Sequence, residues 1–140
     1  MPCDARVKVT YDKDGKVTNM ELLCGDVKCD DGTACKPNPA TNDKKGSDNR
    51  QYCACKDGKG DEPTECHIVL YTVRNKAGKV TDRYYKCEPE DKPDKKVCPA
   101  NQVCAPLPVA NNFFEDDPEK LEWVEIKCQC QSKDDVYPEM

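Results

Sequence analysis

Two stretches of alternating apolar and polar residues each predict a β-hairpin, and their turn residues lie 63 positions apart in the chain. The first covers residues 5–23 and the second covers residues 67–85. Each has turn chemistry at its centre, with Gly15 or Gly78 at the position that favours a positive φ. An Asp-x-Asp-Gly run in the first turn resembles the start of a calcium loop, but the second copy keeps only the glycine. We therefore interpret both as turns.

The cysteines repeat with the hairpins, in two sets of six that share most of their spacing. The first set is Cys3, Cys24, Cys29, Cys35, Cys53 and Cys55, and the second is Cys66, Cys87, Cys98, Cys104, Cys128 and Cys130. A repeat of this kind indicates one structural unit used twice. We expect a small, disulfide-rich, mainly β fold of two tandem modules, each a β-hairpin followed by a cystine-knot-like loop region. The modules are residues 1–57 and 66–132, with a linker at 58–65 and a C-terminal tail at 133–140.

Composition supports a stapled structure with a small core. Hydrophobic residues make up 36% of the chain, but twelve of them are cysteines, and the mean hydropathy is −0.92. Modules of about 60 residues bury too little surface to be stable without cross-links, and each disulfide contributes about 2–4 kcal/mol. An even cysteine count in short modules is typical of an oxidising compartment, so we expect a secreted, extracellular or periplasmic protein. Because Cys3 closely follows Met1, a secreted form is expected to be a mature or engineered one.

Each module is expected to continue after its hairpin into a compact knot. Gly32 and Asn101 occupy matching positions between the third and fourth cysteines, and both residue types readily adopt the left-handed conformation of a tight turn. In each final Cys-x-Cys the two side chains point to opposite faces, so one could close the knot while the other closes the hairpin. Spacing leaves open whether the two cysteines at a hairpin's open end bond directly. Cys66 could also end the first knot, but its 63-residue offset from Cys3 assigns it to the second module.

The run Cys24-x4-Cys29-Asp-Asp-Gly32-x2-Cys35, closed by Cys53-x-Cys55, resembles the small EGF-like subdomain that opens follistatin-type domains. The second module repeats the pattern over about 30 residues. This resemblance implies a secreted, non-catalytic module that binds growth factors, matrix or glycosaminoglycans. No Kazal-type portion follows either unit, and a hairpin precedes each one. The basic residues are also mixed with acidic ones, so the resemblance implies no particular ligand.

The segment between Cys104 and Cys128 distinguishes the second module from the first, because it holds both phenylalanines and the only tryptophan. Asp117-Pro118-Glu119 has the signature of a helix start and predicts a short helix here. Two interpretations compete for the apolar residues of this segment. In one, Phe113, Phe114, Leu121 and Trp123 form the core of the second module. In the other, the candidate binding patch is exposed. Its residues are Leu107, Val109, Phe113, Phe114 and Trp123.

Enzymatic chemistry has no recognisable motif in this chain, so we expect no catalytic residues, no cofactor and no metal site. The net charge of −5, with both signs interspersed, argues against a nucleic-acid partner, and no apolar stretch is long enough to span a membrane. We expect a non-enzymatic binding module with an extracellular protein partner. The alternatives are a self-associating subunit of a surface assembly or filament, a protease inhibitor that presents Leu107 on a braced loop, and a designed protein without a natural ligand.

Overall fold

The structure is a computed structural model that describes residues 3–25, 28, 32, 34–37, 48–54, 66–88 and 97–136. Within these ranges the chain is almost entirely β-structure, as expected. The strands are β1 Arg6–Tyr11, β2 Val17–Leu23, β3 Lys36–Pro37, β4 Asp48–Gln51, β5 Cys53–Ala54, β6 His67–Arg74, β7 Val80–Glu88, β8 Gln102–Phe114 and β9 Asp117–Ser132. A single helical turn, α1 Lys133–Val136, follows the last strand.

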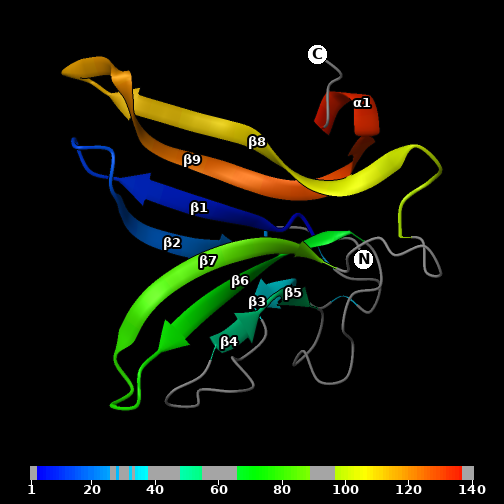
Figure 1. The fold of residues 1–140 in the computed structure, drawn as a ribbon, viewed down its shortest axis with the longest axis horizontal. Coiled ribbons are helices and arrows are strands. Elements are labelled where there is room, and N and C mark those ends of the chain that lie inside the picture. Colours follow the sequence, from blue (N-terminus) through cyan, green and yellow to red (C-terminus); the bar gives the residue numbers. More distant parts are fainter. Residues whose placement is uncertain are drawn as a thin grey trace.

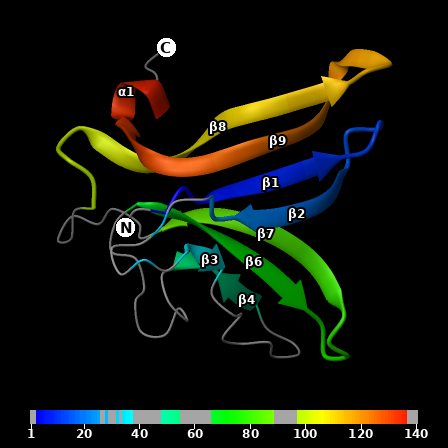
Figure 2. The same ribbon diagram turned by 180° about the vertical axis from the view of Figure 1, so that it is seen from behind.

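The strands form two larger sheets and one short ribbon (Figure 1). The first sheet has the order β2-β1-β9-β8, the second has the order β4-β6-β7, and β3 pairs with β5. All the described pairings are antiparallel. Seen from in front and from behind, the β1–β2, β6–β7 and β8–β9 hairpins point their turns toward the same side of the molecule (Figures 1 and 2).

Both sequence-predicted hairpins are present, and their turns are built in the same way. In the first, the Asp12 carboxylate accepts hydrogen bonds from the backbone N–H groups of Asp14 and Lys16 at 2.9 and 3.0 Å. In the second, the Asn75 side chain accepts the corresponding pair at the same two distances. The turn glycines have φ of 82° and 86°. Because the Asp12 carboxylate accepts these hydrogen bonds from backbone N–H groups of the turn, the interpretation of this segment as a turn is confirmed.

The two repeats exchange strands with each other. β1 of the first repeat pairs with β9 of the second, and β6 of the second pairs with β4 of the first. The registers match as well: Val7 lies opposite Ile126, and Leu70 lies opposite Gln51. In both pairs a residue four places after the first cysteine of one set meets a residue two places before the fifth cysteine of the other. Each of the two larger sheets therefore contains strands from both repeats, and the boundary between the repeats in the sequence does not separate two sheets.

The two repeats also share one hydrophobic cluster. Val7 and Val9 of β1 pack with Ile68 and Leu70 of β6 and with Val124 and other residues of β9. A second, smaller cluster joins the opposite face of β6 to two residues of the first repeat, at and beside β5. Its members are Val69, Tyr52, Ala54 and, at its margin, Tyr71. The second sheet is thus covered on both faces, which explains why Ile68 and Val69, adjacent in sequence, are both fully buried.

The described disulfides stay within each repeat and follow one connectivity. They are Cys3–Cys35, Cys24–Cys53, Cys66–Cys104, Cys87–Cys128 and Cys98–Cys130. The first cysteine bonds the fourth and the second bonds the fifth in both sets, and the third bonds the sixth in the second set. Cys29 and Cys55 lie outside the described residues. Cys66 bonds Cys104 of the second set, as its assignment requires, and the cysteines at the hairpin ends bond cysteines that follow the hairpins in sequence.

The two residues predicted to adopt the left-handed conformation do so, since Gly32 has a φ of 84° and Asn101 has a φ of 66°. In the second Cys-x-Cys, Cys128 closes the hairpin through Cys87, while Cys130 closes the knot through Cys98. The two cysteines of this Cys-x-Cys thus bond different parts of the second repeat, as the sequence predicted for cysteines of an extended segment.

The predicted helix at Asp117-Pro118-Glu119 is wrong. Asp117 begins β9, the chain reverses at residues 115 and 116, and Phe114 lies directly opposite Asp117. The segment predicted as a loop is a long hairpin of β8 and β9. Pairing of β9 with β8, which extends to Asp117, outweighs the local preference for a helix start. Register shifts near Pro108, Asn112 and Phe113 break the alternation that would have identified the hairpin.

Candidate functional site

The five residues of the candidate binding patch all lie on the β8–β9 hairpin. Phe113 is 41% exposed and Val109 is 37% exposed, while Leu107, Phe114 and Trp123 are half-buried. With the equally half-buried Leu121, they stand outside the buried core, so the interpretation of this segment as the core of the second repeat is wrong. The core is instead built from the aliphatic residues of β1, β6 and β9.

Trp123 is on the outer face of the four-stranded sheet. Its neighbour Val124 points into the core, and successive side chains of a strand alternate between faces. The ammonium of Lys8 lies 4.7 Å from the centre of the Trp123 ring, a cation–π contact. Leu107 lies within β8, opposite Lys127, and not on the braced loop expected of a protease inhibitor.

The turn of the β8–β9 hairpin is fastened to the turn of the β1–β2 hairpin through Lys13. Its ammonium forms an ion pair with Asp116 and lies 5.9 Å from the ring centre of Phe114. The hydrogen bond and the charge of Asp116 raise the pKa of Lys13, and the same hydrogen bond lowers the pKa of Asp116. A hollow of about 490 Å³, lined by residues that include Tyr11 and Leu121, lies between the two hairpins. The aromatic end of β8–β9 is therefore braced by a second hairpin.

A group of charged and aromatic side chains on the second sheet was missed by the sequence analysis. Arg50 of β4 donates two hydrogen bonds to one carboxylate oxygen of Glu88, at 2.9 and 2.7 Å, and Tyr71 donates to the other oxygen. Tyr71 stacks on Tyr84 at 4.8 Å, and Lys86 lies 5.8 and 5.7 Å from the two ring centres. Arg50 belongs to the first repeat and the other four to the second, so this group forms only when the repeats pair.

The electrostatics of this group keep Glu88 charged. Burial alone would raise the pKa of Glu88, but hydrogen bonds from Tyr71 and Arg50 and the charge of Arg50 outweigh it and lower the pKa. Burial, the hydrogen bond to Glu88 and the Glu88 charge raise the pKa of Tyr71 to about 12, against the opposing effect of Arg50. At neutral pH the ion pair and the neutral phenol coexist. This group has its charges matched internally, which is typical of a structural element.

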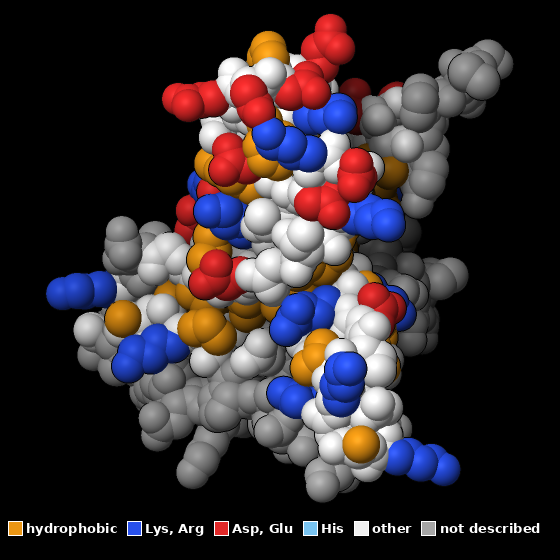
Figure 3. All heavy atoms as spheres, turned by 90° about the vertical axis from the view of Figure 1, so that its left-hand side faces the viewer, with side chains coloured by type: hydrophobic (Ala, Val, Ile, Leu, Met, Phe, Trp, Pro, Cys, Tyr) orange, Lys and Arg blue, Asp and Glu red, His pale blue; other side chains and the backbone are white. Residues whose placement is uncertain are grey.

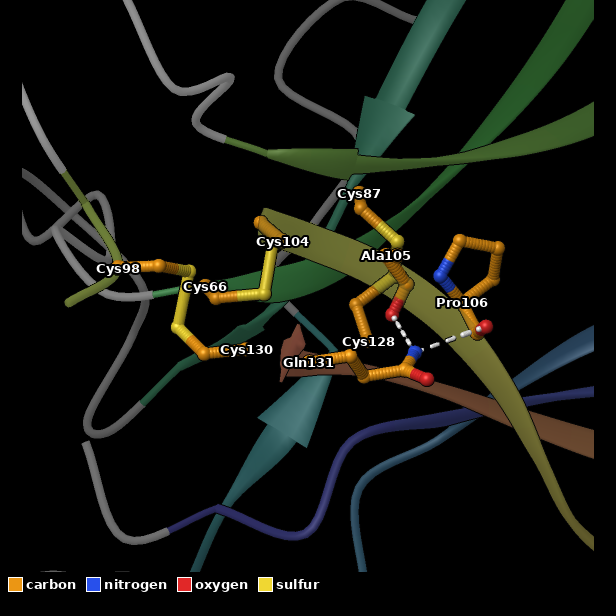
Figure 4. The surroundings of a disulfide bond; sticks show 9 residues. All are labelled: Cys66, Cys87, Cys98, Cys104, Ala105, Pro106, Cys128, Cys130 and Gln131. Carbon is orange, nitrogen blue, oxygen red and sulfur yellow. Dashed lines mark hydrogen bonds between the residues drawn. A yellow bond between two sulfur atoms is a disulfide. The ribbon is translucent and has the colours of Figure 1, made fainter. Parts of the chain in front are cut away.

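Three sulfur atoms of the second knot, from Cys66, Cys98 and Cys130, lie within 4.8 Å of one another (Figure 4). Each belongs to a disulfide, and metals bind thiolates, so the cluster is not a metal site in the oxidised protein. Beside it, the Gln131 amide donates to the backbone carbonyls of Ala105 and Pro106 at 3.0 and 3.1 Å. These two hydrogen bonds join β9 to β8 beside Pro106, which has no backbone N–H group to donate.

Comparison with known proteins returned no match among family models, curated proteins or solved structures. Over the described ranges, no helix has the length and apolar character needed to cross a membrane.

Proposed function

We propose that this chain is a secreted, non-enzymatic binding protein that recognises an extracellular protein partner through the end of the β8–β9 hairpin. The observation that carries the proposal is the position of Phe113. A large aromatic side chain that is 41% exposed, with Val109 also exposed on the same strand, is the kind of residue that anchors protein interfaces.

Rigidity supports the same proposal. β9 is paired with β8 over most of its length and with β1 at residues 123–126, and Lys13 of a second hairpin contacts its turn. Disulfides tie both strands to the rest of the molecule, through Cys104 on β8 and through Cys128 and Cys130 on β9. A surface that is already ordered loses little conformational entropy on binding. Five disulfides among the described residues fit an oxidising, extracellular setting.

The test is a binding screen of the oxidised protein against an array of purified extracellular domains, with two matched variants. Phe113→Ala removes the proposed anchor, and Val17→Ala shortens a residue that is 50% exposed on the edge of the first sheet. We expect Phe113→Ala to weaken binding at least tenfold, as loss of an aromatic hot spot does, and Val17→Ala to bind like the wild type. Partners bound equally by all three proteins, or no partner at all, would refute the proposal.

A further inference from the structure

Charge is distributed unevenly over the side of the molecule toward which the hairpins point. The tip of the β8–β9 hairpin, residues 111–122, carries five carboxylates and one lysine, and we call it the acidic tip. The tip of the β6–β7 hairpin, residues 74–83, carries four basic residues and one aspartate, and we call it the basic tip. Glu115 and Glu119 on the first, and Lys76 and Lys79 on the second, are all exposed.

The two tips project from the same side of the fold and diverge from each other (Figures 1 and 2). Figure 3 looks onto this side and shows acidic side chains gathered at its top and lysine or arginine side chains at its bottom. Between the sheets lies a groove of about 340 Å³, with Val17 and Met20 of β2 on one wall and Val80 of β7 on the other. The side therefore has an acidic end, a partly apolar middle and a basic end, and we call it the tip face.

A surface with this order is complementary to itself. When a second copy is turned by 180° about an axis through the middle of the tip face, its basic end meets the acidic end of the first copy, and the reverse contact forms simultaneously. Such a two-fold arrangement satisfies both charge pairs at once and leaves no free complementary surface, so it closes at two copies.

We propose that the tip face is a dimerisation surface whose partner is a second copy of this chain, with the acidic tip of each copy set against the basic tip of the other. This goes beyond the partner recognition proposed for Phe113, because it rests on the charges and on the groove. The contact is made mainly by exposed charges, so it is weak and sensitive to salt.

The test measures the oligomeric state of the full, oxidised chain by sedimentation, using two charge-reversal variants. Glu115→Lys with Glu119→Lys leaves three carboxylates and three lysines on the acidic tip, so that tip loses its negative charge while the basic tip stays basic. Lys76→Glu with Lys79→Glu leaves two arginines against three carboxylates on the basic tip, so neither tip is then basic. We expect the wild type to form dimers at 50 mM salt, with association weakened at least tenfold at 500 mM salt. Each variant alone is expected to be monomeric, and an equimolar mixture of the two is expected to form a heterodimer.

Net charge provides the control. The glutamate reversals take the chain from −5 to −1, so general repulsion predicts more association, whereas the proposal predicts less. A third variant, Lys36→Glu with Lys133→Glu, takes the chain to −9 through exposed residues of β3 and α1, and it is expected to dimerise like the wild type. A monomeric wild type at low salt, a mixture that fails to associate, or growth beyond dimers would overturn the proposal. Phe113-dependent binding in the array would survive each of these results, so the two proposals fail separately.

Discussion

Cleavage of the chain between residues 58 and 65 tests whether the two repeats form one folded unit. A protease site placed there would be cut after folding and oxidation. Each described disulfide joins cysteines of the same repeat, so the cut fragments would be held together only by non-covalent contacts: strand pairing, core packing and ion pairs such as Arg50–Glu88. We expect the fragments to remain associated, because β1 pairs with β9 and β4 pairs with β6.

The magnitude follows from the shared cluster. Six of its aliphatic side chains are at most 8% exposed, and they come from both repeats: Val7, Val9, Ile68, Leu70, Val124 and Ile126. Full burial of such a side chain contributes about 1.5–3 kcal/mol. If separation exposed only half of each, the cost would be roughly 5–9 kcal/mol, which is comparable to the entire stability of a small domain, about 5–15 kcal/mol. Separated fragments are therefore expected to lose their fold.

Size-exclusion chromatography at about 1 µM, the concentration at which an association of roughly 8 kcal/mol is half complete, measures whether the fragments stay together. Near-ultraviolet circular dichroism of Trp123 reports on the folded state of the second fragment. The uncut protein with the same inserted site is the control. If the fragments elute separately and each keeps a sharp thermal transition, then each repeat has its own core and the reasoning from strand exchange is refuted.

Two further predictions concern charge and redox state. Glu88→Gln should destabilise the protein by about 1–2 kcal/mol at pH 7 through loss of a charge-assisted pair; because the folded-state pKa of Glu88 is lowered, the difference from wild type should hold above about pH 4.5 and disappear as the pH falls through that lowered pKa. Urea unfolding at a series of pH values measures this, and a difference that is unchanged at pH 2 would contradict it. Complete reduction should raise the intact mass by about 12 Da if all twelve cysteines are paired. A rise of about 10 Da would instead leave Cys29 and Cys55 as thiols.

The features that the sequence predicted correctly are those set by neighbouring residues. A hairpin turn depends on a few positions, so Gly15 and Gly78 identified both turns, and Gly32 and Asn101 identified the left-handed residues of the knots. The roles of alternate cysteines followed from the two faces of an extended segment. In each case the physical cause acts within about five residues.

The β8–β9 hairpin was missed because its local signals conflict with its long-range pairing. Asp117 and Pro118 favour a helix start, and the bulges of the hairpin remove the simple alternation of a strand. Pro106 and Pro108 argue against a central strand, but β8 is at the edge of its sheet, where prolines are tolerated. Pairing with β8 over most of its length, and with distant β1 at residues 123–126, makes the extended conformation of β9 the stable one.

The Arg50–Tyr71–Glu88 group was missed for a related reason, since its charged partners are 38 residues apart and belong to different repeats. One contact within it was accessible, however. The register of the second hairpin places Tyr71 directly opposite Tyr84, and such cross-strand aromatic pairs stabilise sheets. Arg50 ends a polar stretch, residues 41–50, that has no alternating apolar pattern, and its assignment to a strand depends on β6 being available as a partner.

The β1–β9 pairing and the β6–β4 pairing are equivalent. This equivalence explains why the repeat in the sequence does not determine which strand pairs with β1 or with β6. The segment after the first cysteine and the segment before the fifth cysteine meet in the same relative register in both sheets. The positions of these two segments relative to the cysteines are therefore compatible with pairing inside one repeat or between the two repeats. The local sequence pattern is the same whichever partner is used. The two arrangements differ in how the core is packed. Pairing between the repeats places Val7 and Val9 against β9, and Ile68 and Leu70 pack into the same cluster. A chain with so few aliphatic residues gains from pooling them in one core, because the buried fraction of the surface rises with the size of the folded unit.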